Sequence, residues 1–399
     1  MLAISSSFAN SNRPLSSTTL PESSYVTSIV ALQSHYAAAT SAPSNAIHLF
    51  DKSDCKTIVR ALSGHDGGID YMCSADSFQG ARQVLLSCGK DGSVKAWDER
   101  TGTVGVQMLS SGRRAPILSC DVSSDGLTVA AGTVLQGDDA LILYWDPRSP
   151  IAPLRRHSSI HSDDITTVRF ARGTPTTVLL SASTDGLICT SNPLEEDEDE
   201  ANIDVGNWGC SISKAGWVRG SDVASTSRVW AVSDMETLSL WSEELNLDQD
   251  IDRDRLAHPD AVLPWVTDYI IDCHNSRNGS FHLFAGSSEG DIALISPHEE
   301  STRWLLEQVY TAGHSEVVRC AHWDETNGLL LTGGEDAKLT VWSSPVHANE
   351  ESGEGGSMDV DSPRKRYTDD DGESVSERQY PPSYSFEEPI LNCVFAIEI

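Results

Sequence analysis

Basic residues are scarce in this chain of 399 residues, which has 28 Lys and Arg against 59 Asp and Glu and a formal net charge of −31. Contacts to phosphate groups need clustered Lys and Arg. The charge balance therefore argues against direct binding of nucleic acid and against binding to anionic membranes. A negative field attracts basic protein partners, although the same charge can simply keep a protein soluble.

Cysteines are few and follow no functional pattern. The nine Cys form no C-x-x-C pair and no Cys/His cluster with zinc spacing. Several, such as Cys88, Cys120 and Cys320, lie in strand-like runs, where small buried thiols in a reducing compartment explain them. The first 22 residues lack the basic segment and long apolar run of a signal peptide or membrane anchor. We expect a location in the nucleus, the cytoplasm or both, and no secretion.

Motifs for common enzyme chemistry are missing. The sequence has no G-x-x-x-x-G-K-[ST] loop, no G-x-G-x-x-G after a strand, no G-x-S-x-G and no H-E-x-x-H. The paired carboxylates Asp163 and Asp164 fall in a predicted turn on which no other titratable group converges. These absences predict a protein that is not an enzyme and that needs no cofactor or metal.

A repeat is present instead. Its clearest copies, residues 85–102 and 330–344, each contain an apolar run, small residues, an acidic turn and an alternating strand. A Trp lies six residues after the turn Asp in both, from Asp91 to Trp97 and from Asp336 to Trp342. The same step, with gaps of 46 to 54 residues, gives seven end positions: Phe50, Trp97, Trp145, Ser191, Trp241, Ile295 and Trp342.

Each copy contains several short β-like runs separated by turn residues, and helical periodicity is nearly absent. Continuous apolar runs at 84–86 and 329–331 suit strands that are buried on both faces. Small sheets stacked around an axis bury both faces and leave only short edges. The sequence therefore predicts an all-β fold, a seven-bladed β-propeller over residues 25–345.

These residues resemble the WD-repeat family. Its signature appears as Gly64-His65 and Gly313-His314 at one end of a repeat, and as Trp97-Asp98 and Trp145-Asp146 at the other. In that family a tetrad of His, Ser or Thr, Asp and Trp stiffens a blade by hydrogen bonds. The resemblance assigns three sets: His65, Ser87, Asp91 and Trp97; His314, Thr332, Asp336 and Trp342; and His161, Ser181 and Asp185, where Ser191 replaces the Trp.

Other repeats depart from this pattern. The third keeps Asp139 and Trp145 without an obvious His, and the fifth has Met235 at the Asp position before Trp241. We expect these blades to rely on apolar packing. The order of an acidic insert, the divergent repeat SISKAGW, VTDYIIDC and a final GGEDAKLTVW is similar to the WD repeat-containing protein 89 group, which supports the architecture more than a function.

Propellers of the resembled family close by lending a terminal strand to the last blade. We favour the N-terminal segment, residues 1–24, as the source of that strand. The run at 389–399 is the alternative, as an extra strand or a cap. Between the propeller and that run, residues 346–388 are rich in Asp, Glu, Ser and Gly and predict a disordered acidic tail.

Two W-D-x-R segments are candidate docking sites. They contain Asp98 and Arg100 in the first copy, and Asp146 and Arg148 in the second. They resemble the box by which some WD-repeat propellers dock on the damaged-DNA-binding-protein-one adaptor of cullin-RING ubiquitin ligases. An exposed Asp and Arg beyond a rigid Trp offer charge-assisted contacts at a fixed separation. The alternative is that each Asp and Arg form only a local surface pair.

Acidity gives a second signal. We interpret residues 195–200 as a charge run that connects blades, and residues 248–260 add a further acidic stretch. With the tail they could hold a basic client such as a histone or ribosomal protein, or serve only as soluble loops. In the tail, Ser362 beside a basic triplet forms a candidate phosphorylation and import site.

We therefore expect a protein-interaction scaffold, monomeric by itself and without catalytic activity. It would be a substrate receptor of a cullin-RING ubiquitin ligase or, as the alternative, an acidic assembly chaperone.

Overall fold

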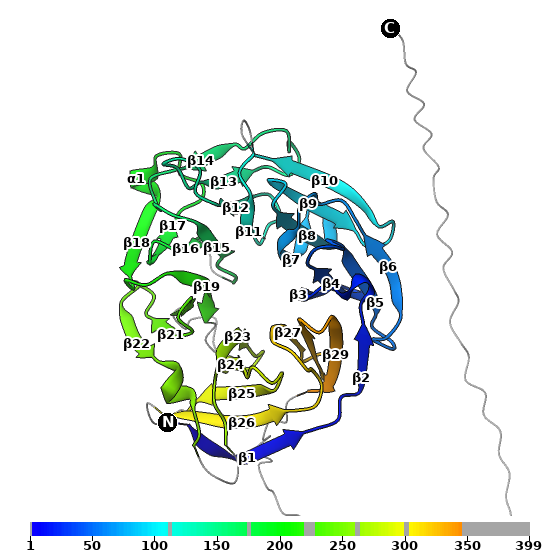
Figure 1. Cartoon of the computed structure of the whole chain (residues 1–399). Coiled ribbons are helices and arrows are strands. Elements are labelled where there is room, and N and C mark those ends of the chain that lie inside the picture. The colour runs from blue at the N-terminus through cyan, green and yellow to red at the C-terminus, as the bar shows by residue number, and fades with distance from the viewer. Residues whose placement is uncertain are drawn as a thin grey trace, which may run out of the picture. The chain divides into compact units, whose positions relative to one another are not determined.

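Seven sheets surround a central axis in the computed structural model (Figure 1). The structure describes residues 2–110, 114–173, 177–218, 228–259, 264–298 and 303–344. The predicted all-β, seven-bladed propeller is confirmed. The predicted acidic tail, the strand at 389–399 and Ser362 lie outside the described residues.

Within each blade, the strands follow the chain from the axis outward. Blades one to four contain β3 (Val26–Ala31), β4 (His35–Thr40), β5 (Ile47–Asp51) and β6 (Ile58–Leu62); β7 (Ile69–Phe78), β8 (Ala81–Gly89), β9 (Ser93–Asp98) and β10 (Thr103–Leu109); β11 (Ile117–Val122), β12 (Val129–Thr133), β13 (Ile142–Trp145) and β14 (Arg155–His157); and β15 (Ile165–Phe170), β16 (Leu179–Ser183), β17 (Leu187–Ser191) and β18 (Asn202–Asn207).

Blades five to seven complete the ring with β19 (Ile212–Val218), β20 (Arg228–Ser233), β21 (Leu238–Trp241) and β22 (Leu247–Ile251); β23 (Tyr269–Asn275), β24 (Phe281–Gly286), β25 (Ile292–Pro297), β26 (Trp304–Tyr310) and β1 (Ala3–Ser11); and β27 (Val318–Asp324), β28 (Leu329–Gly334), β29 (Lys338–Ser343) and β2 (Ser16–Thr19). The described helices are α1 (Glu198–Ala201), η1 (Pro21–Ser23) and η2 (Arg253–Leu256). None of the helices in the described ranges is long and apolar enough to span a membrane.

The seven repeat positions occupy one level of the ring. Each lies on the third strand of its blade and pairs with a residue of the second strand, as Trp97 does with Leu85 and Trp342 with Leu330. The stand-ins Ser191 and Ile295 pair in the same way. All seven side chains are buried, so blades packed face to face around the axis cover them from both sides.

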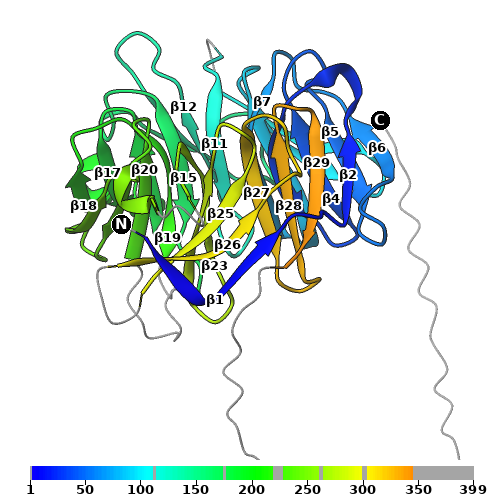
Figure 2. The ribbon, with the colours of Figure 1, turned by 60° about the horizontal axis from the view of Figure 1, so that its bottom comes forward.

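The N-terminal segment closes the ring. Strand β2 pairs antiparallel with β29 and becomes the outer strand of blade seven, as favoured from the sequence (Figure 2). Strand β1 was not predicted as a separate element. It runs parallel to β26 and gives blade six a fifth strand, and Leu2 ahead of it is buried and donates its N–H to Ala257 O at 3.0 Å. Residues 2–19 therefore join blades six and seven along the outside.

Because consecutive strands are antiparallel, the loops gather at two ends of the ring. We call the end with the turns of Asp91, Asp185 and Asp336 the turn face. The opposite end, where third strands finish at the W-D-x-R segments, is the box face.

Both acidic runs differ from expectation. Residues 195–200 join β17 to β18 inside blade four on the box face, so their interpretation as a connection between blades was wrong. The run at 248–260 is partly regular structure, because it includes most of β22 and the short helix η2.

Candidate interaction sites

The residues of the first tetrad meet at the turn face of blade two. The Nδ1 atom of His65 lies 3.0 Å from Asp91 Oδ1, and its Nε2 atom lies 2.7 Å from Ser87 Oγ. The indole N–H of Trp97 donates to the same hydroxyl at 2.8 Å. One continuous chain of hydrogen bonds thus links the turn to the third strand.

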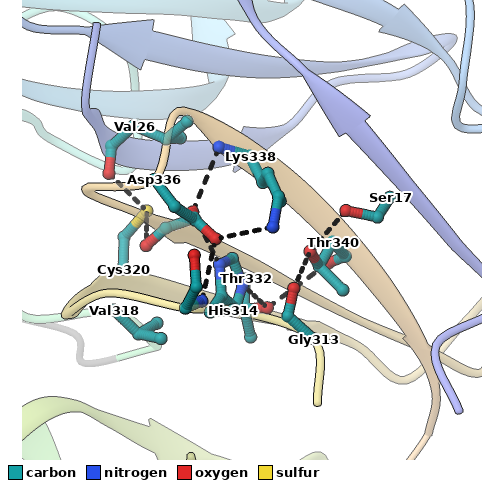
Figure 3. Close-up of polar contacts among 12 residues, drawn as sticks. Ser17, Val26, Gly313, His314, Val318, Cys320, Thr332, Asp336, Lys338 and Thr340 are labelled. Carbon is teal, nitrogen blue, oxygen red and sulfur yellow. Dashed lines mark hydrogen bonds and ion pairs between the residues drawn. The ribbon is translucent and has the colours of Figure 1, made fainter. Parts of the chain in front are cut away.

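Blade seven repeats this arrangement, with His314 held between Asp336 at 3.0 Å and Thr332 at 2.8 Å (Figure 3). The indole N–H of Trp342 donates to Thr332 Oγ1 at 3.0 Å. Burial alone would raise the pKa of Asp336, but hydrogen bonds from His314 and other donors outweigh burial and lower it to about 2. The carboxylate therefore stays ionised under a buried imidazole.

In the other blades described next, fewer groups at the tetrad positions take part in such hydrogen bonds. In blade four His161 lies 3.3 Å from Asp185 and 2.8 Å from Ser181, and Ser191 takes the place of the indole. Trp241 of blade five donates to Ser239 at 2.8 Å, so the expectation that this blade relies on apolar packing alone was wrong for its indole. The buried N–H of Trp145 in blade three has no acceptor among the described residues.

These imidazole, hydroxyl and carboxylate groups bond to one another within their own blades. His65, His161 and His314 are all buried, and every ring nitrogen has a protein partner. Buried polar groups that all have partners are typical of structural hydrogen-bond networks. In the described parts of the chain, no three His, Cys, Asp or Glu side chains form a group that could hold a metal ion.

The two W-D-x-R segments lie on the box face but differ in how their arginines are held. Arg148 forms a two-point ion pair with Asp146, at 2.6 Å and 2.9 Å. Arg100 approaches Asp98 only to 3.7 Å, and its side chain is 85% exposed. Asp98 instead accepts the backbone N–H of Arg100 at 2.9 Å, which fixes the turn while leaving the guanidinium accessible.

The acidic segment at 195–200 is ordered. The carboxylate of Glu198 accepts the backbone N–H groups of Ser158 at 2.9 Å and Ser159 at 2.6 Å, and Asp197 caps α1. Their neighbours Glu196, Asp199 and Glu200 remain exposed. Beside them the apolar side chains of Leu194, Ile203 and Val205 are each about half exposed. This stretch therefore combines negative charge with an apolar surface.

A cavity of about 360 Å³ lies in the central channel, which sequence reasoning missed. Its lining comes from five inner strands and β20, and includes Tyr71, Arg169, Gly216, Trp217 and Trp230. The signal in the sequence was the Arg in the strand ITTVRF. A charged side chain at a position where the strands pack around an axis faces the channel or must be paired.

The comparisons with known proteins agree with this architecture. A family model described as WD domain, G-beta repeat matches residues 56–98 and 306–343. The chain is 28% identical over 344 residues to WD repeat-containing protein GTS1 of Arabidopsis thaliana, covering 82% of this chain and 83% of that protein. It is 29% identical over 309 residues to the WD repeat-containing protein 89 homolog of Dictyostelium discoideum, covering 75% and 77%. A shorter match, 39% over 80 residues, covers 20% of this chain and 17% of the ribosome biogenesis protein WDR12 homolog of Oryza sativa subsp. japonica.

Proposed function

The chain is a WD-repeat β-propeller, and we propose that it is a scaffold that docks on the adaptor of a cullin-RING ubiquitin ligase through Asp98 and Arg100. WD-repeat proteins serve as protein-interaction scaffolds, and the family is generally not catalytic. In this role the box would hold the adaptor while other loops hold the protein to be modified.

The observation that carries this proposal is the exposure of the Arg100 guanidinium, which Asp98 approaches only to 3.7 Å. Its five N–H donors have a fixed geometry suited to a carboxylate or a pair of carbonyl groups. The turn below it is anchored, because Asp98 accepts backbone N–H groups of Arg100 at 2.9 Å and Thr101 at 3.3 Å. The backbone of the turn is already fixed before binding, so only the Arg100 side chain has to be ordered, at about 0.5–1.5 kcal/mol.

We expect Arg100→Ala to weaken binding to the purified damaged-DNA-binding-protein-one adaptor by about tenfold or more, the usual loss for one charge-assisted contact. Arg148→Ala is the matched control, since Arg148 stands at the same place in the next blade but is already paired with Asp146. Isothermal titration calorimetry would compare the two. Equal affinities of the wild type and the Arg100 variant would remove this role.

A second candidate function rests on the ordered acidic segment. Exposed carboxylates beside Leu194, Ile203 and Val205 suit a partner that is both basic and partly apolar, such as a histone or a ribosomal protein during assembly. The relative that matches over 80 residues is itself named as a ribosome biogenesis protein. Such a protein would act as an acidic assembly chaperone.

This second function predicts that the triple variant Glu196→Gln, Asp199→Asn and Glu200→Gln will bind purified core histones about tenfold more weakly at low salt, with a flatter salt dependence. Asp197 and Glu198 stay in place because they hold the local fold. The control neutralises three exposed carboxylates elsewhere, through Asp66→Asn, Asp76→Asn and Glu243→Gln. Equal losses in both triples would mean that only total charge matters.

A further inference from the structure

The central cavity contains a cation without a carboxylate partner. The guanidinium of Arg169 lies 4.3 Å from the centre of the Tyr71 ring, and one of its N–H groups donates to Val168 O at 3.2 Å. Among the described residues no carboxylate lies within ion-pair distance of it. A guanidinium has five N–H donors, so most of those on Arg169 face the cavity unused.

The neighbouring charges do not neutralise Arg169. Asp121 is the acidic group of the cavity wall, and it is already engaged by Arg172 at 2.7 Å and by the backbone N–H of Phe170 at 2.8 Å. Asp121 and, to a smaller extent, Asp272 act on Arg169 only through their electric fields, because neither carboxylate bonds to its guanidinium in the described structure. The positive charge of Arg169 at the cavity wall therefore has no carboxylate bonded to it in the described structure.

A second donor comes from blade five. Gly216 stands at the level of Arg169 on the next inner strand, and a Cβ there would lie 2.9 Å from Trp230 Nε1. The absent side chain thus leaves room for the Trp230 indole at the cavity wall. Its N–H has no acceptor in the described part of the chain, so it provides a second hydrogen-bond donor in the lining of the cavity that Arg169 also lines.

The walls of the cavity are aromatic and rigid. Tyr71 stacks under Arg169, and the indole N–H of Trp217 donates to Arg169 O at 3.1 Å. Asn275 donates to Trp217 O at 2.7 Å and holds that strand end in place. A volume of about 360 Å³ is at the small end of ligand pockets and suits a single small group.

We propose that this cavity binds one oxyanion, a phosphate or a carboxylate, carried on an aromatic or apolar group. Arg169 and the Trp230 N–H would hold the oxyanion, and the aromatic walls would hold the group that carries it. The formal charge of −31 on the whole chain repels polyanions, so the site favours a ligand with a single anionic group. This site does not depend on docking through Asp98 and Arg100.

The test titrates the full chain with phenyl phosphate, inorganic phosphate and phenol while recording tryptophan fluorescence and heat. We expect phenyl phosphate to bind more tightly than inorganic phosphate, and phenol to bind least. Arg169→Gln will weaken the binding of phenyl phosphate by about tenfold or more. Arg169→Lys keeps the charge but loses the forked set of N–H donors, so it will weaken binding by an intermediate factor. Arg148→Gln, a change of an exposed arginine on the box face, will leave binding unaltered.

A further arm uses a peptide that contains phosphotyrosine. Tighter binding than phenyl phosphate identifies a peptide side chain as the source of the oxyanion, and exclusion of the peptide identifies a free small molecule. With either result, Arg169→Gln must show the same loss of binding affinity. The proposal is overturned if phenyl phosphate does not bind at about 10 mM, or if Arg169→Gln, folded by circular dichroism, binds it as well as the wild type.

Discussion

Deleting residues 1–19 will destabilise the propeller by about 3 kcal/mol or more. This value takes the loss of each backbone hydrogen bond made by β2 to cost about 1 kcal/mol. Without β2, blade seven keeps three strands and β29 becomes an open edge. The deletion also removes the hydrogen bond from Leu15 N to Val341 O at 2.8 Å and the contact of Ser17 with Thr340 at 3.1 Å. A ring that is not closed loses the mutual support of its first and last blades.

Deletion of residues 1–11 is the control for that experiment. It removes β1 but leaves blade six with four strands and blade seven complete. Urea unfolding followed by tryptophan fluorescence will place its midpoint between those of the wild type and of the longer deletion. If both deletions shift the midpoint equally, then the pairing of β2 with blade seven adds nothing to the stability of the ring.

The closing segment illustrates which part of the fold could be predicted. The strands of each blade follow from local patterns, because the six-residue step from a turn Asp to a Trp fixes both the turn and the third strand. Strand β2, SSTT, carries no apolar signal of its own and was assigned through the resemblance. Strand β1 pairs with residues about three hundred positions away, as Ala3 does with Leu305, and no local pattern encodes such a partner.

The same distinction applies to the candidate sites. The six-residue step located Asp336 and Trp342, and the resemblance to the WD-repeat family assigned His314 and Thr332 as their partners before any contact was known. The cavity around Arg169 has no such repeat, because its lining comes from five blades at unequal positions. Gly216 contributes by lacking a side chain, which becomes meaningful only when Trp230 is seen beside it.

Replacing His314 by Ala will cost about 2–4 kcal/mol at pH 7, because the buried Thr332 hydroxyl and the Asp336 carboxylate both lose a partner. The matched control is His48→Ala in blade one. Both imidazoles are buried, with exposures of 6% for His314 and 4% for His48, but neither ring nitrogen of His48 has a hydrogen-bond partner in the described structure. We therefore expect His48→Ala to cost at least about 1 kcal/mol less.

The pH dependence separates the lost hydrogen bonds from the lost volume. The pKa of Asp336 is lowered from 3.8 to about 2, so the folded state holds fewer protons there than the unfolded state. Its contribution, about 2 kcal/mol, is present above pH 4 and is lost as the pH falls through 2. In His314→Ala the pKa moves back toward 3.8, and stability between pH 4 and pH 2 will fall less steeply than in the wild type or in His48→Ala. If stability, measured by urea titration, falls with pH in parallel for all three proteins, then His314 does not lower the pKa of Asp336.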